Sequence, residues 1–319
     1  MHPPAGNPKV SVIIPTFNRA ALVQEAIASV LAQTYTDFEC IVVDDGSTDQ
    51  TKAALQPLFA SARIQYVYQP NAGLSAARNH GLRVARGAYI SFLDDDDLYE
   101  PTKLARQVEY LDAHPDAMLV HCWFSKFNEH NPDLGLRKPD WFQGWLYPAI
   151  LSYWRMLIAT PCLMFRREVF DTVGVFDESL RYAEDFDMWR RIARTYAFHR
   201  VPESLVRIRQ QATSMSSHKA GSAAHFRTVL DKAFADDPQL SPRLRSNALA
   251  AMYISVAQNL LGEGGPADIR AARQHIRTAL RLRPLAPVAW LTLAASLMPL
   301  GLRGALAGVV RRLRFRRQA

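Results

Sequence analysis

Four consecutive aspartates, Asp94 to Asp97, directly follow the apolar run "YISFL". In an extended segment alternate side chains point the same way, which puts Asp94 and Asp96 on one face. Asp95 and Asp97 then share the other face. Two carboxylates that converge at a strand end can bind a hard divalent cation, which takes oxygen ligands from the protein and from substrate phosphates. A solvated acidic loop that caps the next helix would use the same residues, and the run alone does not separate the two interpretations.

Polar loops of a similar kind follow the neighbouring apolar runs. In "VVDDGSTD", Asp44 and Asp45 precede a tight turn at Gly46. A carboxylate in this place can accept a hydrogen bond from a base N–H or from a ribose hydroxyl. In "AGLSAAR", Arg78 and the backbone amides near a helix start can contact phosphate. With "PTFNR" and the aspartate run, four such loops occur, which is too regular for four unrelated turns.

These loops need a scaffold that brings them together. Apolar, β-branched runs predict strands over residues 9–17, 38–47, 63–70 and 88–94. Helical periodicity predicts helices between them, with Asn18 placed to cap the first. Continuous apolar strands that alternate with helices indicate a parallel sheet covered on both faces. Ligands of such a sheet bind beyond the carboxyl ends of its strands, so the four loops should line one crevice.

The second half of the chain is less regular. Further strands are predicted over residues 117–124 and 197–210, and the pattern over 160–195 predicts a strand, a helix, a turn and a second helix. The stretch from Asn128 to Trp154 is rich in aromatic residues, namely Trp141, Trp145, Tyr147 and Trp154. These rings can line a pocket for an acceptor or pack under a long loop, and both alternatives are open.

The positive charge of the chain is concentrated at its end. The 319 residues carry a formal net charge of +8. From Ala267 onward there are eleven arginines and one acid, Asp268, so this segment carries +10 and the remainder −2. A nucleic-acid-binding function of the whole chain is therefore not indicated. The tail is helical in pattern, which favours packing for its first part, and either packing or contact with an anionic membrane for residues 286–319.

The cysteines and the N-terminal residues indicate the cellular compartment of the protein. Cys40, Cys122 and Cys162 lie far apart without metal-type spacing, which predicts buried thiols in a reducing compartment. The N-terminus has no basic segment followed by a long apolar one, so no signal peptide is expected. No apolar stretch reaches the length of a spanning helix. The expected location is the cytoplasm, with peripheral attachment to the inner face of the cell membrane as a further option.

Five segments carry a resemblance to a known family. They are "VSVIIPTFNR", "VVDDGSTD", "NAGLSAARNHGL", "YISFLDDDDLYEP" and "VGVFDESLRYAEDFDMWRRIA". In this order they resemble the successive motifs of glycosyltransferase family 2, inverting enzymes of the GT-A fold, over residues 8–215. The resemblance implies an α/β fold with a Rossmann-like, mostly parallel sheet flanked by helices and an α-helical C-terminal extension. It also implies a catalytic domain over residues 1–220, with a donor half (8–115) and an acceptor half (116–220), before a basic helical extension over 221–319.

The resemblance assigns roles to individual residues. Those that would bind the nucleotide sugar are Pro15, Thr16, Phe17, Asp44, Asp45, Asn71, Gly73, Arg78, Asp94 and Asp95. Asp96, together with Asp94, would bind a divalent cation, Mn²⁺ or Mg²⁺. Asp185 of "AEDFD" would be the general base that removes the proton of an acceptor hydroxyl as this attacks the anomeric carbon. Ordinary negative charge at a helix N-terminus is the alternative explanation for Glu184 and Asp185.

One segment departs from the family pattern. Family members often have a histidine before an "S-M-S"-like turn, where it can help to bind the metal or the diphosphate. The corresponding segment, "RIRQQATSMS", has Gln210 and Gln211 instead. Glutamine is a poorer ligand for a divalent cation, so metal binding would depend on Asp96 and water unless His218 reaches the site.

The expected function is transfer of a sugar from a nucleoside diphosphate donor, with a uridine-linked donor favoured, to a hydroxyl of a glycan or lipid-linked acceptor, as in polysaccharide biosynthesis. A sugar nucleotidyltransferase is the first alternative, but such an enzyme would need a Gly-rich, basic phosphate loop after the first strand. The segment "PTFNRA" in this place lacks it. The second is a non-catalytic, nucleotide-sugar-binding scaffold. It predicts a lost base or metal site, whereas Asp96 and Asp185 are both present. A nucleic-acid partner is not expected.

Overall fold

A computed structural model describes residues 6–153, 158–211, 222–263 and 265–298. The chain divides into two compact units. The sheet unit comprises residues 1–146 and 158–212, and the helical unit comprises residues 147–157 and 213–319. The short segment 147–157, which the resemblance puts in the acceptor half, thus groups with the C-terminal helices.

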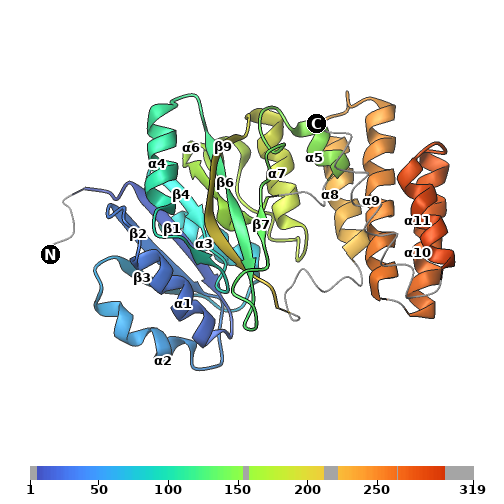
Figure 1. Cartoon of the computed structure of the whole chain (residues 1–319). Coiled ribbons are helices and arrows are strands. Elements are labelled where there is room, and N and C mark those ends of the chain that lie inside the picture. Colours follow the sequence, from blue (N-terminus) through green and yellow to red (C-terminus); the bar gives the residue numbers. More distant parts are fainter. Residues whose placement is uncertain (1–5, 154–157, 212–221, 264, 299–319) are drawn as a thin grey trace. The chain divides into compact units, whose positions relative to one another are not determined.

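The first half of the sheet unit is the predicted parallel sheet. Its strands, in spatial order, are β3 (Ile64–Tyr68), β2 (Phe38–Asp44), β1 (Val10–Thr16) and β4 (Tyr89–Phe92). All residues of β1, β2 and β4 are buried, as continuous apolar strands in a sheet covered on both faces should be. The connecting helices are α1 (Ala20–Leu31), α2 (Thr51–Leu55) with a short 3-10 helix after it (Gln56–Ala60), and α3 (Leu74–Val84). Figure 1 shows these elements in blue to cyan.

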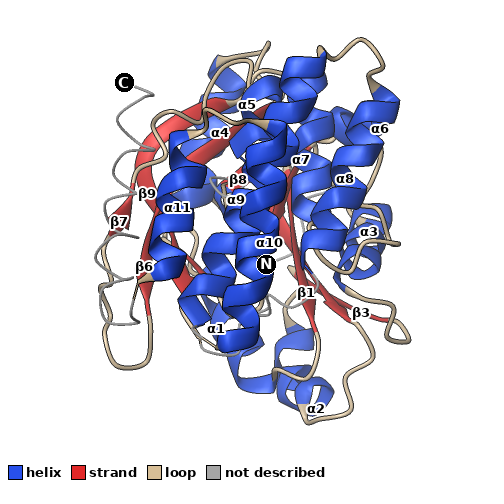
Figure 2. Cartoon of the chain, turned by 90° about the vertical axis from the view of Figure 1, so that its right-hand side faces the viewer, coloured by secondary structure: helices blue, strands red, loops and turns tan. Residues whose placement is uncertain are grey.

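The second half of the sheet is mixed in direction. Strand β8 (Leu163–Arg166) runs antiparallel to β4 and to β6 (Leu119–Phe127), whereas β6 runs parallel to β9 (His199–Arg209). Two short strands complete the sheet, with β5 (Leu98–Tyr99) antiparallel to β9 and β7 (Leu136–Arg137) antiparallel to β6. Figure 2 shows the strands in red among the helices in blue. Because β5 follows the aspartate run directly, its pairing with β9 holds the end of that run against the last strand.

Aromatic rings anchor the helices of the second half to the sheet. Phe92, at the end of β4, contacts Phe165 of β8 (6.3 Å between ring centroids), Phe170 of α6 (Glu168–Val173; 6.0 Å) and Phe176 (5.3 Å). Trp189 of α7 (Glu184–Thr195) stacks on Phe165 at 5.6 Å. Pairs of this kind contribute about 0.5–1.5 kcal/mol each beyond their burial. Helix α7 is therefore held at a set place relative to the end of β4, where the aspartate run begins.

Asn18 does not cap α1, contrary to the prediction. The N-cap residue is Arg19, and Asn18 has a left-handed backbone conformation with φ 54°. Its Oδ1 accepts hydrogen bonds from the backbone N–H groups of Thr48 (2.7 Å) and Asp49 (3.2 Å). Asp49 Oδ2 in turn accepts the N–H of Ala20 at the start of α1 (3.3 Å). Asn18 thus connects the loop after β1 with the loop after β2, because its backbone conformation turns the side chain away from its own helix.

The three cysteines are buried free thiols, as predicted. Burial raises the pKa of Cys40 to about 12 and that of Cys162 well above its ordinary value. A thiol whose pKa is raised in this way carries little thiolate near neutral pH, so these side chains serve packing rather than chemistry.

A lysine lies in the core of the sheet unit without an ion-pair partner among the described residues. Lys103, the first residue of α4 (Lys103–Ala113), is completely buried. Its Nζ donates a hydrogen bond to Ser91 Oγ and lies 4.0 Å from the centroid of the Tyr99 ring. Burial lowers the pKa of Lys103 to about 7 from an ordinary value of 10.5. The folded chain thus disfavours the charged amine, which the unfolded chain holds readily.

Replacing this amine should stabilise the protein in a pH-dependent way. Between pH 7 and pH 10.5 the unfolded chain binds a proton that the folded chain does not, so the free energy of unfolding rises with pH across this window. Lys103→Met removes that dependence and should raise the free energy of unfolding most near pH 7 and least near about pH 10. Urea unfolding at both pH values measures the difference, with Lys52→Met, an exposed lysine of α2, as the control. A stabilisation of equal size at both values, or a loss of stability near pH 7, would contradict the prediction.

The helical unit consists of α5 (Tyr147–Tyr153), α8 (Ser222–Asp236), α9 (Pro242–Glu263), α10 (Pro266–Leu282) and α11 (Pro287–Leu297). Helix α10 contacts both α9 and α11, and the three lie side by side in Figure 1 and Figure 2. On α10, Ala272, Ile276 and Ala279 are completely buried, whereas Arg277 and Arg281 are exposed. The predicted helical pattern and the packing of the first part of the tail are confirmed within the described residues, and residues 299–319 lie outside them. Across the described helices, none combines the length and the apolar character needed to cross a bilayer.

Candidate active site

The polar loops contact one another at the carboxyl ends of the parallel strands. Thr16, the last residue of β1, donates a hydrogen bond from Oγ1 to Asp95 Oδ2 over 2.8 Å. Asp45, after β2, accepts one from the backbone N–H of Gly73, immediately before α3, at 2.8 Å. Together with the contacts of Asn18, these bonds join all four loops at one edge of the sheet, where the strand pattern predicts a ligand site.

The aspartate run forms a turn rather than an extended segment, so the expected alternation of faces is wrong. The N–H of Asp97 donates a hydrogen bond to the carbonyl of Asp94 at 3.1 Å, and the four side chains reach different partners as a result. Asp97 points inward, where its Oδ1 accepts the backbone N–H of Arg209 at 2.8 Å. At 4% exposure, Asp97 fastens the run to β9 and does not face a ligand.

Asp95 and Asp96 share a cation that the chain itself supplies. Nη1 of Arg19 lies 2.8 Å from Asp95 Oδ1 and 2.9 Å from Asp96 Oδ2. Burial raises the pKa of Asp95 to about 6 and raises that of Asp96 as well, while Arg19 opposes both shifts. One positive charge between two neighbouring carboxylates thus helps to keep both ionised. Arg19 is not among the residues predicted for the site, and its place directly after "PTFN" is the signal that could have indicated it.

A buried arginine links the aspartate run to the start of α7. Arg78 of α3, 2% exposed, donates hydrogen bonds from Nη2 to Asp94 Oδ1 (2.8 Å) and from Nη1 to Glu184 Oε1 (3.1 Å). Its guanidinium also lies 5.2 Å from the centroid of the Phe176 ring. Since both terminal nitrogens already bind carboxylates, the predicted contact of Arg78 with a donor phosphate would have to use its remaining N–H groups, of which the buried Nε–H has no hydrogen-bond partner among the described residues. The same contacts make Arg78 a bridge between two parts of the site.

Asp185, the predicted base, lies next to this bridge. Helix α7 begins at Glu184, after Ala183, whose φ of 63° turns the chain into the helix. Asp185 is half-buried, and burial raises its pKa, with Asp94 adding to the shift and Arg78 opposing it. Burial also raises the pKa of Glu184 to about 7. A raised carboxylate pKa suits a general base, because proton transfer is most efficient when the pKa of the base lies near the working pH.

Ordinary helix charge explains a neighbouring carboxylate better than it explains Asp185. Asp187, 2% exposed, forms ion pairs with Arg190 (2.8 Å) and Arg191 (2.9 Å) on its own helix. Asp185 accepts the N–H of Phe186 (2.6 Å) and forms no ion pair within the described part of the chain. Its carboxylate is therefore the more available of the two to a bound hydroxyl.

The residues predicted to hold the nucleotide base differ in their exposure to solvent. Phe17 is 44% exposed and offers an aromatic face, whereas Pro15 is buried within β1. Asp44 is 1% exposed and accepts hydrogen bonds from the N–H of Ser47 (2.8 Å) and from the hydroxyl of Tyr66 (2.6 Å). Phe17 can therefore stack on a base, while Pro15 and Asp44 shape the loops around it.

Asp45 organises the loop before α3. Its carboxylate accepts hydrogen bonds from the side chain of Gln69 (2.7 Å) and from the N–H groups of Ala72 (2.9 Å) and Gly73 (2.8 Å). Its carbonyl accepts one from Asn71 Nδ2 at 2.9 Å. Gly73 has φ 94°, a conformation that favours glycine. A carboxylate has about four lone-pair positions, so three are filled in Asp45, which is 4% exposed, and a base or a ribose hydroxyl would have to reach the fourth.

The aspartate run offers a divalent cation part of a coordination shell. The carboxylate oxygens of Asp94 and Asp96 are ligands of the kind that Mg²⁺ and Mn²⁺ bind, and the position of Arg19 shows that positive charge fits beside the run. Among the described residues, no three or more histidine, cysteine, aspartate or glutamate side chains are placed so that they could hold a metal ion together. A cation would therefore complete its shell with water and substrate phosphate, as Mg²⁺ commonly does.

Comparison with known proteins identifies the family. Residues 11–174, half of the chain, match Glycosyl transferase family 2. The chain belongs to this family. An uncharacterized glycosyltransferase of Rickettsia typhi is 35% identical over 206 residues, which cover 64% of this chain and 64% of that relative. The chain thus spans somewhat less than two thirds of the relative's length.

Two solved structures show the fold of this glycosyltransferase. S. aureus TarS 1-349, in complex with UDP-GlcNAc, matches with a TM-score of 0.66 at 20% identity, over 95% of this chain and 89% of that one. The mannosyltransferase PcManGT from Pyrobaculum calidifontis, in complex with GDP-Man and Mn²⁺, matches with a TM-score of 0.58 at 22% identity, over 97% and 88%. The chain therefore has the expected GT-A fold, with helices after the sheet.

The glutamine that replaces the histidine of the family pattern is already engaged. Oε1 of Gln210 accepts a hydrogen bond from Lys126 Nζ at 3.2 Å, and its backbone N–H donates to the carbonyl of Phe127 at 2.8 Å. Gln211 is half-buried, and His218 lies outside the described residues. A metal contact from Gln210 would therefore require its bond to Lys126 to break.

The aromatic residues of the glycosyltransferase between strands β6 and β8 divide between the two alternatives. Trp141 packs edge-on against Phe142, with 5.1 Å between ring centroids, whereas Trp145 is 71% exposed. Tyr147 is the first residue of α5 in the helical unit, and Trp154 lies outside the described residues. Packing thus explains Trp141, and the open indole of Trp145 suits contact with a large acceptor.

Proposed function

We propose that this glycosyltransferase transfers a sugar, with inversion at the anomeric carbon, from a nucleoside diphosphate donor to a hydroxyl of a glycan or lipid-linked acceptor. The observation that carries the proposal is the bridge made by Arg78, which binds Asp94 of the aspartate run and Glu184, the neighbour of Asp185. Donor-side carboxylates and a candidate base thereby lie on two sides of one buried cation. This arrangement suits a single in-line displacement, in which base and leaving group act from opposite sides.

Each carboxylate has its own part in the proposed reaction. Asp185 accepts the proton of the acceptor hydroxyl while the oxygen attacks the anomeric carbon and the nucleoside diphosphate departs. Glu184 holds the start of α7 on Arg78, which keeps Asp185 in place. Phe17 stacks on the base, and Asp45 binds the base or the ribose through its remaining lone pair.

A divalent cation is the proposed cofactor, with Asp96 and Asp94 as its protein ligands. When bound, such a cation would neutralise the negative charge of the diphosphate, which makes the diphosphate a better leaving group. PcManGT with Mn²⁺ and TarS with UDP-GlcNAc are the related folds that support a metal and a nucleotide-sugar donor. A uridine-linked donor is the first candidate, since the matched structure of TarS holds UDP-GlcNAc.

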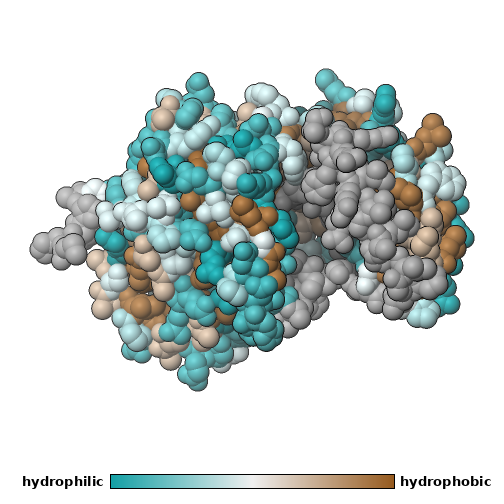
Figure 3. All heavy atoms as spheres, in the orientation of Figure 1, coloured by the Kyte–Doolittle hydropathy of each residue, from teal (hydrophilic) through white to brown (hydrophobic). Residues whose placement is uncertain are grey.

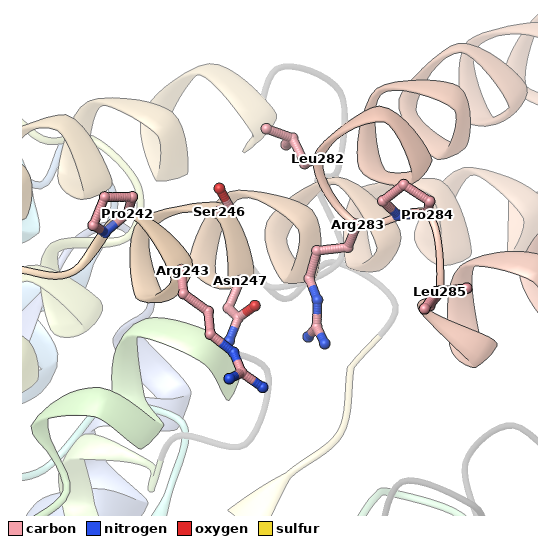
Figure 4. A pocket seen from close by; sticks show the side chains of 8 residues that line it. All are labelled: Pro242, Arg243, Ser246, Asn247, Leu282, Arg283, Pro284 and Leu285. Atoms are coloured by element: carbon pink, nitrogen blue, oxygen red, sulfur yellow. The ribbon is translucent and has the colours of Figure 1, made fainter.

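The helical unit suits attachment to an anionic membrane, where a lipid-linked acceptor would lie. Leu285 is 91% exposed, Trp290 54% and Leu297 67%, and Figure 3 shows hydrophobic residues in brown at the end of the view where Figure 1 places α11. A hollow of 420 Å³ is lined by Pro242, Arg243, Ser246, Asn247, Leu282, Arg283, Pro284 and Leu285. In Figure 4 the side chains of Arg243 and Arg283 extend toward the same side. Arginine heads beside exposed apolar side chains are typical of surfaces that contact anionic lipid headgroups.

A donor panel tests the proposed reaction. The full chain is incubated with UDP-, GDP- and TDP-linked sugars, with and without Mn²⁺, and release of the nucleoside diphosphate is measured. We expect Mn²⁺-dependent turnover of at least one donor, in which water takes the place of the acceptor and receives the sugar. NMR early in the reaction, before the free sugar mutarotates, should show the opposite anomeric configuration to the donor.

The same panel, extended by an incubation with nucleoside triphosphates and sugar 1-phosphates, separates the rival functions. Formation of a nucleotide sugar from a nucleoside triphosphate and a sugar phosphate would indicate a nucleotidyltransferase. Metal-dependent donor binding without turnover would indicate a scaffold. A chain that neither turns over nor binds any donor contradicts the proposed function altogether.

A further inference from the structure

We infer that Arg19 is an internal counter-ion, which occupies the aspartate run in the donor-free enzyme and has to leave Asp96 when a divalent cation binds. The inference rests on the proposed function, in which Asp96 is a metal ligand. It adds a residue of this chain that competes with the metal and thereby couples metal binding to donor binding.

One nitrogen atom makes both contacts. Nη1 of Arg19 lies 2.8 Å from Asp95 Oδ1 and 2.9 Å from Asp96 Oδ2, so a single N–H-bearing atom stands between two adjacent carboxylates. A divalent cation bound to a carboxylate oxygen would lie about 2.0–2.2 Å from it. Guanidinium and cation would then be neighbours on one carboxylate, and two positive charges at such a distance repel strongly. Metal binding to Asp96 therefore displaces Arg19.

Arg19 is also the arginine of the site that can move. Its side chain is 27% exposed, and within the described structure its side-chain hydrogen bonds go to Asp95 and Asp96 alone. Arg78, by contrast, is 2% exposed and held by carboxylates on both sides. The carboxylate partners of Arg19 are 9% and 14% exposed, but its own long side chain reaches solvent, so Arg19 can exchange partners more readily than the fully buried Arg78.

The donor diphosphate offers the displaced guanidinium a new partner. Arginine binds phosphate oxygens through charge-assisted hydrogen bonds, so the released side chain of Arg19 would gain there what it loses at Asp96. The metal alone has to compete with Arg19, but the metal together with a nucleoside diphosphate does not. Each ligand should therefore increase the affinity for the other by the same factor, and part of that factor belongs to Arg19.

Binding of Mn²⁺, followed by electron paramagnetic resonance of the free ion, tests the inference without any turnover. The full chain is titrated with Mn²⁺ alone and again with saturating UDP. The variants are Arg19→Met, which keeps the apolar stem, and Arg19→Lys, whose single ammonium can replace Nη1. Arg106→Met is the matched control, because Arg106 is an exposed arginine that forms ion pairs with Glu109 and Glu203 of the surface.

We expect an effect of the Arg19→Met substitution in the titration without UDP and none in the titration with UDP. Without UDP, Arg19→Met should bind Mn²⁺ about tenfold more tightly than the unaltered chain, because the internal competitor is gone. With UDP the gain should vanish, so that the mutual enhancement of Mn²⁺ and UDP falls by about tenfold. Arg19→Lys should stay close to the unaltered chain in both titrations, and Arg106→Met should not differ from it.

The outcomes separate this inference from the proposed function. Unchanged or weaker Mn²⁺ binding by Arg19→Met without UDP, in a chain that still binds Mn²⁺ with UDP, overturns the role of Arg19 and leaves the proposed function intact. Absence of Mn²⁺ binding by the unaltered chain even with UDP overturns both. If Arg19→Met does not fold, as judged by circular dichroism, Arg19→Gln removes the charge with a shorter polar side chain, and the same expectations apply.

Discussion

Asp185→Asn is expected to reduce sugar transfer by about 10²–10⁴-fold, the range that a positioned acid or base contributes. The amide has nearly the shape of the carboxylate but cannot accept the proton of the acceptor hydroxyl. Because Asp185 forms no ion pair within the described part of the chain, the substitution leaves the Arg78 bridge intact. Transfer is measured as turnover at saturating donor, and donor binding by calorimetry with UDP and Mn²⁺, which should change little.

A neighbouring carboxylate of the same helix provides the control. Asp187→Asn removes a buried partner of Arg190 and Arg191, so it should lower the melting temperature clearly. It should change turnover little. If Asp185→Asn loses donor binding together with transfer, Asp185 belongs to the donor site and its role as base is wrong. If transfer survives at the level of the unaltered enzyme, another group accepts the proton.

Arg78→Met is expected to be strongly destabilising, by about 3–5 kcal/mol, because it leaves buried carboxylates on both sides without their cation. For a unit of this size such a loss lowers the melting temperature by about 10 °C. The effect should depend on pH through Glu184, whose pKa in the folded chain is raised to about 7 from an ordinary value of 4.5. A raised carboxylate pKa means that stability is lost as pH rises through the folded value, and removal of Arg78 raises that pKa further. The destabilisation should therefore be larger at pH 8 than at pH 6.

Two comparisons show whether the bridge is responsible. Arg78→Met combined with Glu184→Gln removes one of the stranded charges and should recover part of the lost stability, most of it at pH 8. Arg106→Met, which breaks exposed ion pairs, should cost about 1 kcal/mol or less. Equal costs for Arg78→Met and Arg106→Met, or no recovery in the double variant, would mean that the Arg78 bridge does not hold the two parts of the site together.

The parallel half of the fold could be predicted from the sequence because its signals are local. The strands β1, β2 and β4 are mainly apolar, fully buried runs, and the helices between the strands have a 3.6-residue period, so each element could be recognised within its own residues. The position of the polar loops followed from the rule that such strands end at one edge. The direction of β8, by contrast, depends on a neighbour more than seventy positions earlier, β4, and no local pattern specifies it.

The partners of the predicted site residues were harder to predict from the sequence. The aspartate run was predicted as an extended segment, since the residues before it form a strand, but the bond from Asp97 to the carbonyl of Asp94 makes it a turn. Arg78 was predicted to contact phosphate because it lies near a helix start. Its actual partners include Glu184, which lies 106 positions further along the chain. A pairing over that separation becomes visible only when the chain is folded.

The amino-acid sequence by itself determined which chemical groups this glycosyltransferase brings to its site, and in which loops they stand, because motif order and strand ends are properties of neighbouring residues. Only the tertiary structure decided how their charges are balanced. In the folded chain Arg19 lies between Asp95 and Asp96, and Arg78 lies between Asp94 and the start of α7. The physical reason is that a buried charge is stabilised by whichever opposite charge the fold places within hydrogen-bonding distance, and sequence separation sets no limit on that choice.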